Sequence, residues 1–178
     1  YVAASIPEPG RVRHGGRGDL VIGDVPASQT AAVRETFEPA GVPCRLSNNI
    51  DGELWQKLTL NCAGNAVTAL TRSSYGPAVA NPLVRHVMEA ALDETRNVAR
   101  AAGVTLRDDG PETSANAIRL LESYGPATSS TAQDIARGRR TEIDSLNGYV
   151  AKRGAELGVP TPVNRTLHAL VKLLEEAR

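Results

Sequence analysis

Regular helix-end signals beyond Asp51 constrain the fold of this chain more than any other feature of its sequence. The segment 81–103 shows three of them: Asn81 at a capping position, Pro82 at the first helical position and Gly103 as terminator. Comparable signals predict five more helices, over 51–70, 111–123, 130–137, 141–157 and 161–176. The expected caps are Asp51, Ser130 and Thr141, the last two in capping boxes with Gln133 and Asp144.

The first 50 residues show a different pattern, that of short strands separated by turns. Apolar runs at 2–6, 20–22 and 42–46 predict strands, and proline and glycine separate the first two. A helix is expected over 28–40, with Ser28 as its cap. These elements are too few for a complete α/β sheet. The expected fold class is therefore mostly α, with a partial α/β region at 1–50 and five to six helices at 51–178.

The stretch Gly15-Gly16-Arg17-Gly18 is the only candidate for a phosphate-binding loop. A dinucleotide fingerprint requires a third glycine and must follow a strand and open a helix. Here position 21 is Val, and a strand follows instead of a helix. We expect a tight turn at 15–18.

Composition argues against a strongly electrostatic partner. The 178 residues contain 20 Lys plus Arg and 20 Asp plus Glu, and aromatic residues make up 3%. Nucleic-acid binding requires clustered basic residues, and single-stranded bases also require aromatic platforms. We therefore expect neither nucleic acid nor a membrane surface as the partner. The 41% hydrophobic content excludes disorder as the main state.

Cysteine and histidine usage indicates a cytoplasmic protein without a metal site. Cys44 and Cys62 are 18 residues apart, and His14, His86 and His168 are scattered, so no spacing suits zinc. No apolar run approaches the roughly 18 residues of a membrane span, and no signal peptide is recognisable. The chain opens with Tyr1 inside an apolar run, which suggests that it is cut within a fold.

A polar stripe runs along the expected helix 51–70. Lys57, Asn61 and Asn65 recur at i, i+4 and i+8, which places them on one side of the helix. The flanking positions are so apolar that the helix should be largely buried, and a ligand could then bind the stripe. Alternatively, the stripe faces solvent and Lys57 pairs with Glu53. Gly64, which is unfavourable within a helix, indicates close approach by a ligand or by another helix.

A second polar constellation lies at two successive expected helix starts, 129–134 and 139–148. Its simplest interpretation is capping by Ser130 and Thr141, with Arg139 and Arg140 on a solvated face. A helix N-terminus also offers unpaired N–H groups and a positive partial charge, which suit a substrate carboxylate. The two interpretations are compatible.

Four motifs follow one another through the helical region. They are Leu54-Trp55-Gln56-Lys57-Leu58 with Asn61 and Asn65, Ser129-Ser130 with Gln133-Asp134, Thr141-Glu142-Ile143-Asp144 with Asn147-Gly148, and Gly158-Val159-Pro160-Thr161-Pro162-Val163-Asn164. This ordered set resembles ketopantoate reductases, the NADPH-dependent 2-dehydropantoate 2-reductases. The resemblance implies that 1–50 is the end of a Rossmann-type cofactor domain and that 51–178 is the helical substrate-binding and catalytic domain.

The resemblance also implies roles for five residues and a reaction. Lys57 matches the lysine that protonates the keto oxygen, and Glu142 the glutamate that completes the catalytic network. Asn61, Asn65 and Ser130 match substrate-binding positions. Ketone reduction builds negative charge on oxygen, so a cation with a transferable proton suits this chemistry. The implied activity is NADP-dependent reduction of 2-dehydropantoate to (R)-pantoate in pantothenate biosynthesis, on the route to coenzyme A.

Further expectations follow from the resemblance and its limits. Ala127 and Thr131 stand where the family often has Asn and Met, so a related 2-oxo acid is an alternative substrate. Without the glycine fingerprint the isolated chain should be inactive, and relatives suggest a homodimer through the helical domain. Lys57 and Glu142 should meet at the mouth of a cleft facing the first 50 residues. The competing hypothesis is a non-catalytic helical dimerisation or metabolite-sensing module.

Overall fold

The computed structural model describes residues 2–23, 26–107, 110 and 113–177 of the chain. Tyr1 lies outside these ranges, as do Pro111 and Glu112, with which the expected helix 111–123 begins. The chain divides into two compact units, Tyr1–Asp51 and Gly52–Arg178. This division falls one residue from the boundary that the sequence suggests. The assignment of the units to cofactor and substrate binding stays a prediction.

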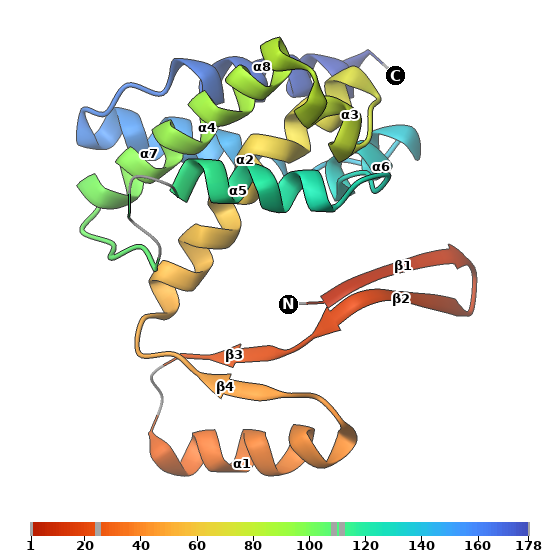
Figure 1. Ribbon diagram of the computed structural model, residues 1–178, viewed down its shortest axis with the longest axis vertical. Coiled ribbons are helices and arrows are strands. Elements are labelled where there is room, and N and C mark those ends of the chain that lie inside the picture. Colours follow the sequence, from red (N-terminus) through yellow and green to blue (C-terminus); the bar gives the residue numbers. More distant parts are fainter. Residues whose placement is uncertain (1, 24–25, 108–109, 111–112, 178) are drawn as a thin grey trace. The chain divides into compact units, whose positions relative to one another are not determined.

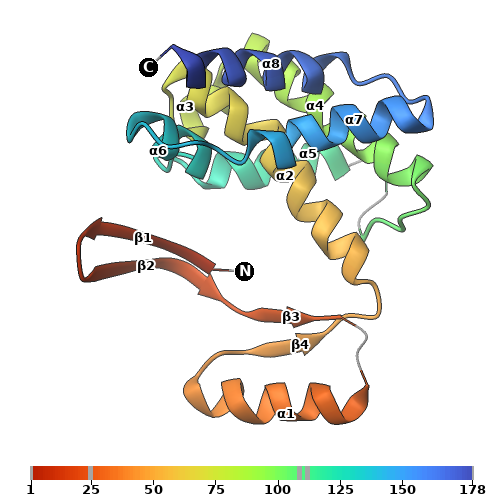
Figure 2. The ribbon, with the colours of Figure 1, turned by 180° about the vertical axis from the view of Figure 1, so that it is seen from behind.

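In the first unit, β1 (Val2–Glu8) and β2 (Arg11–Gly18) form an antiparallel hairpin (Figures 1 and 2). The chain turns at Gly10, whose φ of 81° is readily adopted by glycine. The tight turn expected at 15–18 is wrong, because these residues belong to β2. The strand register skips Gly15 and Arg17, and bulges of this kind let a glycine-rich segment remain paired.

The rest of the first unit is a β–α–β segment. Strands β3 (Leu20–Ile22) and β4 (Cys44–Leu46) pair in parallel. Parallel strands require a crossover, which α1 (Ala27–Phe37) and the 3₁₀ turn η1 (Glu38–Ala40) provide. The helix begins immediately after Pro26, so Ser28 lies inside it and the cap expected there is wrong.

The described part of the second unit consists of α-helices and one 3₁₀ turn, and this confirms the mostly α fold class with a small α/β region. The helices are α2 (Ile50–Thr71), α3 (Tyr75–Ala80), α4 (Pro82–Ala101), α5 (Thr113–Ser123), α6 (Ser130–Ala136), α7 (Asn147–Leu157) and α8 (Pro162–Glu176). The 3₁₀ turn η2 (Ile143–Ser145) precedes α7. Within the described ranges, no helix is both long and apolar enough to cross a bilayer.

Helix α2 forms the centre of the second unit. All its residues from Cys62 to Ala69 are buried, because apart from Asn65 the side chains there are apolar or small. Figures 1 and 2 show the other helices of the unit around this part of α2. Two clusters of apolar side chains surround it. One contains Met88, Leu92, Ile118, Leu121, Ile143 and Val171, and the other contains Trp55, Val98, Leu106 and Val150.

Three helix starts differ from the sequence analysis. Asp51 is not a cap, since α2 begins at Ile50. The cap of α6 is Ser129 rather than Ser130: its hydroxyl accepts the Ala132 N–H at 3.0 Å. The helix expected to begin at Thr141 is divided into η2 and α7, because the backbone leaves helical geometry at Leu146. Helix α3 was not predicted, because six residues containing Gly and Pro give no periodic signal.

Helix α4, by contrast, begins as predicted. A carboxylate of α4 caps the first turn of α8. Asn81 caps α4 through the N–H groups of Leu83 and Val84. Thr161 makes no such bond for α8. Instead the Glu94 carboxylate accepts the backbone N–H groups of Val163 and Asn164 at 2.8 and 2.9 Å. A carboxylate is favourable at a helix N-terminus because it meets unpaired donors and the positive end of the dipole.

We expect Glu94→Ala to lower the free energy of unfolding by about 1–3 kcal/mol, because it leaves these donors unpaired at a half-buried site. Urea denaturation measures the change. Glu89→Ala is a suitable control, since Glu89 lies on the same helix in a partly exposed surface pair with Arg85. Such surface pairs contribute less than about 1 kcal/mol. Equal losses in the two variants would contradict the capping role.

Candidate functional site

The polar stripe of α2 runs from the protein surface into its core. Lys57 is exposed, Asn61 is half-buried and Asn65 is 3% exposed. In the described part of the chain, neither the Lys57 ammonium nor the Asn61 amide has a hydrogen-bonding or ionic partner. Glu53 is buried and accepts a hydrogen bond from Arg107 at 3.4 Å. The stripe therefore presents one solvated cation at one end and one enclosed amide at the other.

Asn65 is held by two neighbouring segments. The Tyr75 hydroxyl donates to Asn65 Oδ1 at 3.1 Å, and the Ser129 hydroxyl donates to the Asn65 carbonyl at 3.2 Å. Thr68 in turn donates to Ser129 Oγ at 2.7 Å. These bonds attach both α3 and the start of α6 to the same turn of α2.

Gly64 allows α3 to approach this closely. A Cβ atom at position 64 would lie 2.5 Å from Tyr75 Cε1, which is shorter than any ordinary carbon contact. The close approach that this glycine indicates in the sequence is therefore made by another helix. Tyr75 itself was missed, because no motif or periodicity distinguishes it.

Ser130 follows the buried Ser129 directly and is exposed at the first turn of α6. Because Ser129 contacts the Asn65 carbonyl, the structure brings the start of α6 to the inner end of the stripe. Ser130 was expected as the cap. The inward-facing Ser129 takes that position, and this leaves the Ser130 hydroxyl unpaired among the described residues.

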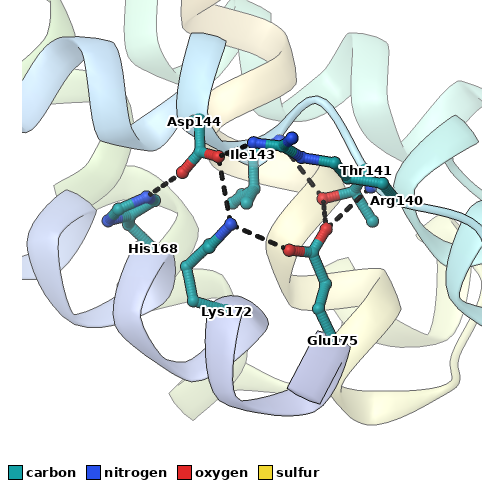
Figure 3. A network of polar contacts seen from close by, with 7 residues as sticks. All are labelled: Arg140, Thr141, Ile143, Asp144, His168, Lys172 and Glu175. Atoms are coloured by element: carbon teal, nitrogen blue, oxygen red, sulfur yellow. Dashed lines mark hydrogen bonds and ion pairs between the residues drawn. The ribbon is translucent and has the colours of Figure 1, made fainter. Parts of the chain in front are cut away.

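Glu142 lies in a segment whose neighbouring residues are anchored to α8 (Figure 3). Thr141 donates its N–H and its hydroxyl to Glu175 Oε1, both at 2.7 Å. The Thr141 hydroxyl also accepts the Ile143 N–H at 3.2 Å. Glu142 itself is exposed, and its carboxylate has no partner in the part of the chain that the structure describes. The approach of Lys57 to Glu142 stays a prediction.

Asp144 is the centre of the same network. Its Oδ1 lies 2.8 Å from His168 Nε2, and its Oδ2 accepts from Lys172 at 3.0 Å and from Arg140 at 3.2 Å (Figure 3). His168 and then Lys172 hold the pKa of Asp144 well below its usual range. Burial alone would raise the pKa of Glu175, but bonds from Thr141 and Lys172 outweigh it and lower that pKa.

The described residues form neither a cluster of metal ligands nor a phosphate-binding turn for a dinucleotide. They contain no group of three or more His, Cys, Asp or Glu side chains that could hold a metal ion. Gly15–Gly18 lies within the hairpin strand β2 and does not open a helix. A pyrophosphate requires a glycine-rich turn at a helix N-terminus. The described residues therefore do not fit the main phosphate site of a nicotinamide dinucleotide.

We expect Asp144→Asn to reduce stability at neutral pH by up to about 1 kcal/mol, since the carboxylate is partly exposed. A depressed folded pKa stabilises the protein above the unfolded pKa of about 3.9, and this contribution is lost as the pH falls through the folded value. The difference from the wild type should therefore shrink below about pH 4. Unfolding by urea at neutral and acidic pH measures it.

Asp134→Asn is the matched control for this experiment. It makes the same change of charge at a carboxylate without a partner in the described ranges. A stability gap for Asp144→Asn that stays constant from neutral pH to about pH 3 would contradict the depressed pKa.

Comparisons with known proteins agree with the architecture. The family model described as "Ketopantoate reductase PanE/ApbA C terminal" matches residues 49–175. The 2-dehydropantoate 2-reductase of Archaeoglobus fulgidus is 31% identical over 175 residues, which cover 97% of this chain and 58% of that relative. A PanE/ApbA family ketopantoate reductase from Ralstonia eutropha JMP134 is 50% identical with a TM-score of 0.90, over 99% of this chain and 58% of that chain.

A D-mandelate dehydrogenase, solved with NADH and anilino(oxo)acetate, has a TM-score of 0.85 at 23% identity, over 99% of this chain and 58% of that chain. That likeness shows a shared fold alone. The chain spans less than two thirds of the length of these relatives. The family match covers more than half of this chain and begins just before α2. The chain therefore belongs to the ketopantoate reductase family, and the matched region is that family's C-terminal domain.

Proposed function

We propose that this chain provides the substrate-binding and proton-donating part of an NADPH-dependent reductase. The reaction is reduction of 2-dehydropantoate to (R)-pantoate in the cytoplasm, a step of pantothenate biosynthesis on the route to coenzyme A. Family membership and the names of the relatives support this reaction. The observation that carries the proposal is the polar stripe of α2, whose exposed end is the Lys57 ammonium, without a partner in the described ranges.

Lys57 acts as the general acid in this proposal. Reduction of a ketone places negative charge on the former keto oxygen, and an ammonium group within hydrogen-bonding distance stabilises that charge and transfers a proton to it. The absence of a competing ionic partner among the described residues supports this role. A lysine in a tight ion pair would have to break that pair before each transfer.

Three further polar side chains bind and orient the substrate. Asn61, Asn65 and Ser130 provide amide and hydroxyl groups suited to a carboxylate and a hydroxyl of a small polar acid. Glu142 completes the network around the proton donor. The anchoring of its neighbours Thr141 and Ile143 supports a defined position for its backbone.

We assign NADPH as the cofactor from the family to which the chain belongs, because the described residues include no pyrophosphate site. NADPH would supply the reducing equivalents, and its phosphates would be bound by residues other than these. We expect the isolated 178-residue chain to lack activity for that reason.

We expect Lys57→Ala to lower kcat by roughly 100- to 10,000-fold, because the proton is donated in the transition state. The assay follows NADPH oxidation by a chimaera in which the N-terminal segment of the Ralstonia eutropha relative precedes this chain. Lys152→Ala, at an exposed position of α7, is the control. An unchanged kcat in Lys57→Ala would exclude the general-acid role. Ketopantoate binding without any turnover would favour the non-catalytic sensing module.

The proposal includes a homodimer formed through the helical unit. Neighbouring helices α4 and α8 carry large apolar side chains that remain exposed, among them Leu83 at 80% and Leu173 at 62%. Exposed apolar patches of this kind are typical of association surfaces.

We expect light scattering to give twice the chain mass of 18.8 kDa at about 100 μM, a concentration at which a dimer of micromolar affinity is mostly formed. Leu83→Glu should shift the mass toward the monomer, because it places a charge in the interface. Leu120→Glu, at an exposed leucine of α5, should not. A constant monomer mass in the wild type would refute the dimer.

A further inference from the structure

Tyr75 is fixed from both sides of its ring and along its backbone. It is the first residue of α3 and is 8% exposed. One edge of the ring occupies the space that the missing side chain of Gly64 leaves open. The ring also packs edge-on against Tyr124, with centroids 5.4 Å apart. Its backbone N–H donates to the Ala127 carbonyl at 3.0 Å.

The position of the ring determines where its hydroxyl points. The hydroxyl donates to Asn65 Oδ1 at 3.1 Å. Burial, and to a lesser extent Tyr124, raises the pKa of Tyr75 to about 12. The hydroxyl therefore remains protonated and available as a donor throughout the physiological range.

In this bond the Asn65 amide has its oxygen, and not its nitrogen, toward Tyr75. A carboxamide is planar, and its oxygen and nitrogen point in different directions from the same carbon. When Oδ1 faces Tyr75, the two Nδ2 protons face away from it. Nδ2 has no partner among the described residues, and it is not one of their buried unpaired atoms. The amide thus presents two free N–H donors on the stripe that also carries Asn61 and Lys57.

We propose that Tyr75 is a positioning residue that holds the Asn65 amide with its N–H donors toward an oxygen of the bound 2-oxo acid. This inference rests on the proposed function, since it requires Asn65 to contact the substrate. Without the Tyr75 hydroxyl the amide loses this bond and also samples the flipped orientation, which presents a carbonyl oxygen to a substrate oxygen. Two acceptors facing each other repel, so the loss should appear in substrate binding.

Tyr75→Phe is the appropriate variant, because it removes the hydroxyl and keeps the ring that packs against Gly64. The first measurement uses the 178-residue chain and does not depend on activity. The side-chain amide signals of Asn65 are identified in a ¹⁵N-labelled sample by their loss in Asn65→Asp. We expect these signals to shift and broaden in Tyr75→Phe. Tyr124→Phe should leave them unchanged, because Tyr124 contacts the Tyr75 ring and not the amide. Identical Asn65 signals in wild type and Tyr75→Phe would overturn the proposal.

The second measurement is steady-state turnover of 2-dehydropantoate by the chimaera. We expect Tyr75→Phe to raise KM about 5- to 10-fold, the equivalent of one neutral hydrogen bond, with kcat within about twofold of wild type. Tyr124→Phe should change neither constant. In an Asn65→Ala background, Tyr75→Phe should add no further effect on KM, because its partner is already gone. A further KM increase there, or an unchanged KM in the single variant, would overturn the positioning role.

The two measurements separate this inference from the proposed function. If Lys57→Ala retains full kcat, the proposed chemistry fails, while the Asn65 amide signals still report whether Tyr75 fixes the amide. If Lys57→Ala loses kcat as expected and Tyr75→Phe leaves KM unchanged, the proposed function stands and the positioning role is excluded.

Discussion

Burial of α2 is the constraint on which the second unit depends. A helix enclosed on all sides cannot leave its polar groups unpaired, since each buried orphan costs about 1–3 kcal/mol. The buried Thr59 hydroxyl donates to a carbonyl of its own helix, and the buried Thr68 hydroxyl donates to Ser129 Oγ. Asn65 is paired by Tyr75, and the Cys62 carbonyl accepts a bond from Asn147 of α7 at 3.0 Å. The neighbouring helices therefore attach to α2 at its polar points as well as by apolar packing.

The same constraint accounts for the order of residues along the stripe. A buried unpaired ammonium costs far more free energy than a buried amide, so the cation is tolerated only at the exposed end. Lys57 occupies that end, and the amide of Asn65 occupies the enclosed end. A substrate that binds along the stripe would meet its charged partner at the surface and its neutral donors deeper in the protein.

Local signals in the sequence were sufficient where a helix end depends on its own residues. Asn81 and Pro82 start α4 as predicted, and the i, i+4 spacing correctly placed Lys57, Asn61 and Asn65 on one helix. Local signals were insufficient where a contact with a residue distant in the sequence determines the helix start or the packing. The spacing to Gln133 favours Ser130 as the cap, but it is Ser129 that bonds Thr68 and Asn65 and takes the capping position. Gly64 within the helix indicated that another group packs closely there, but nothing in the sequence identified that group as Tyr75.

Two of the residues to which the family resemblance assigns a role, Ser130 and Glu142, are positioned in the same way. Ser130 follows the anchored Ser129, and Glu142 lies between Thr141 and Ile143, whose N–H groups are bonded. Within the described ranges, the side chains of Ser130 and Glu142 have no partner of their own. Anchoring the neighbour fixes the backbone of the candidate residue without occupying its side chain. A site built in this way would be rigid before a ligand arrives, and its polar groups would not have to break internal bonds to bind one.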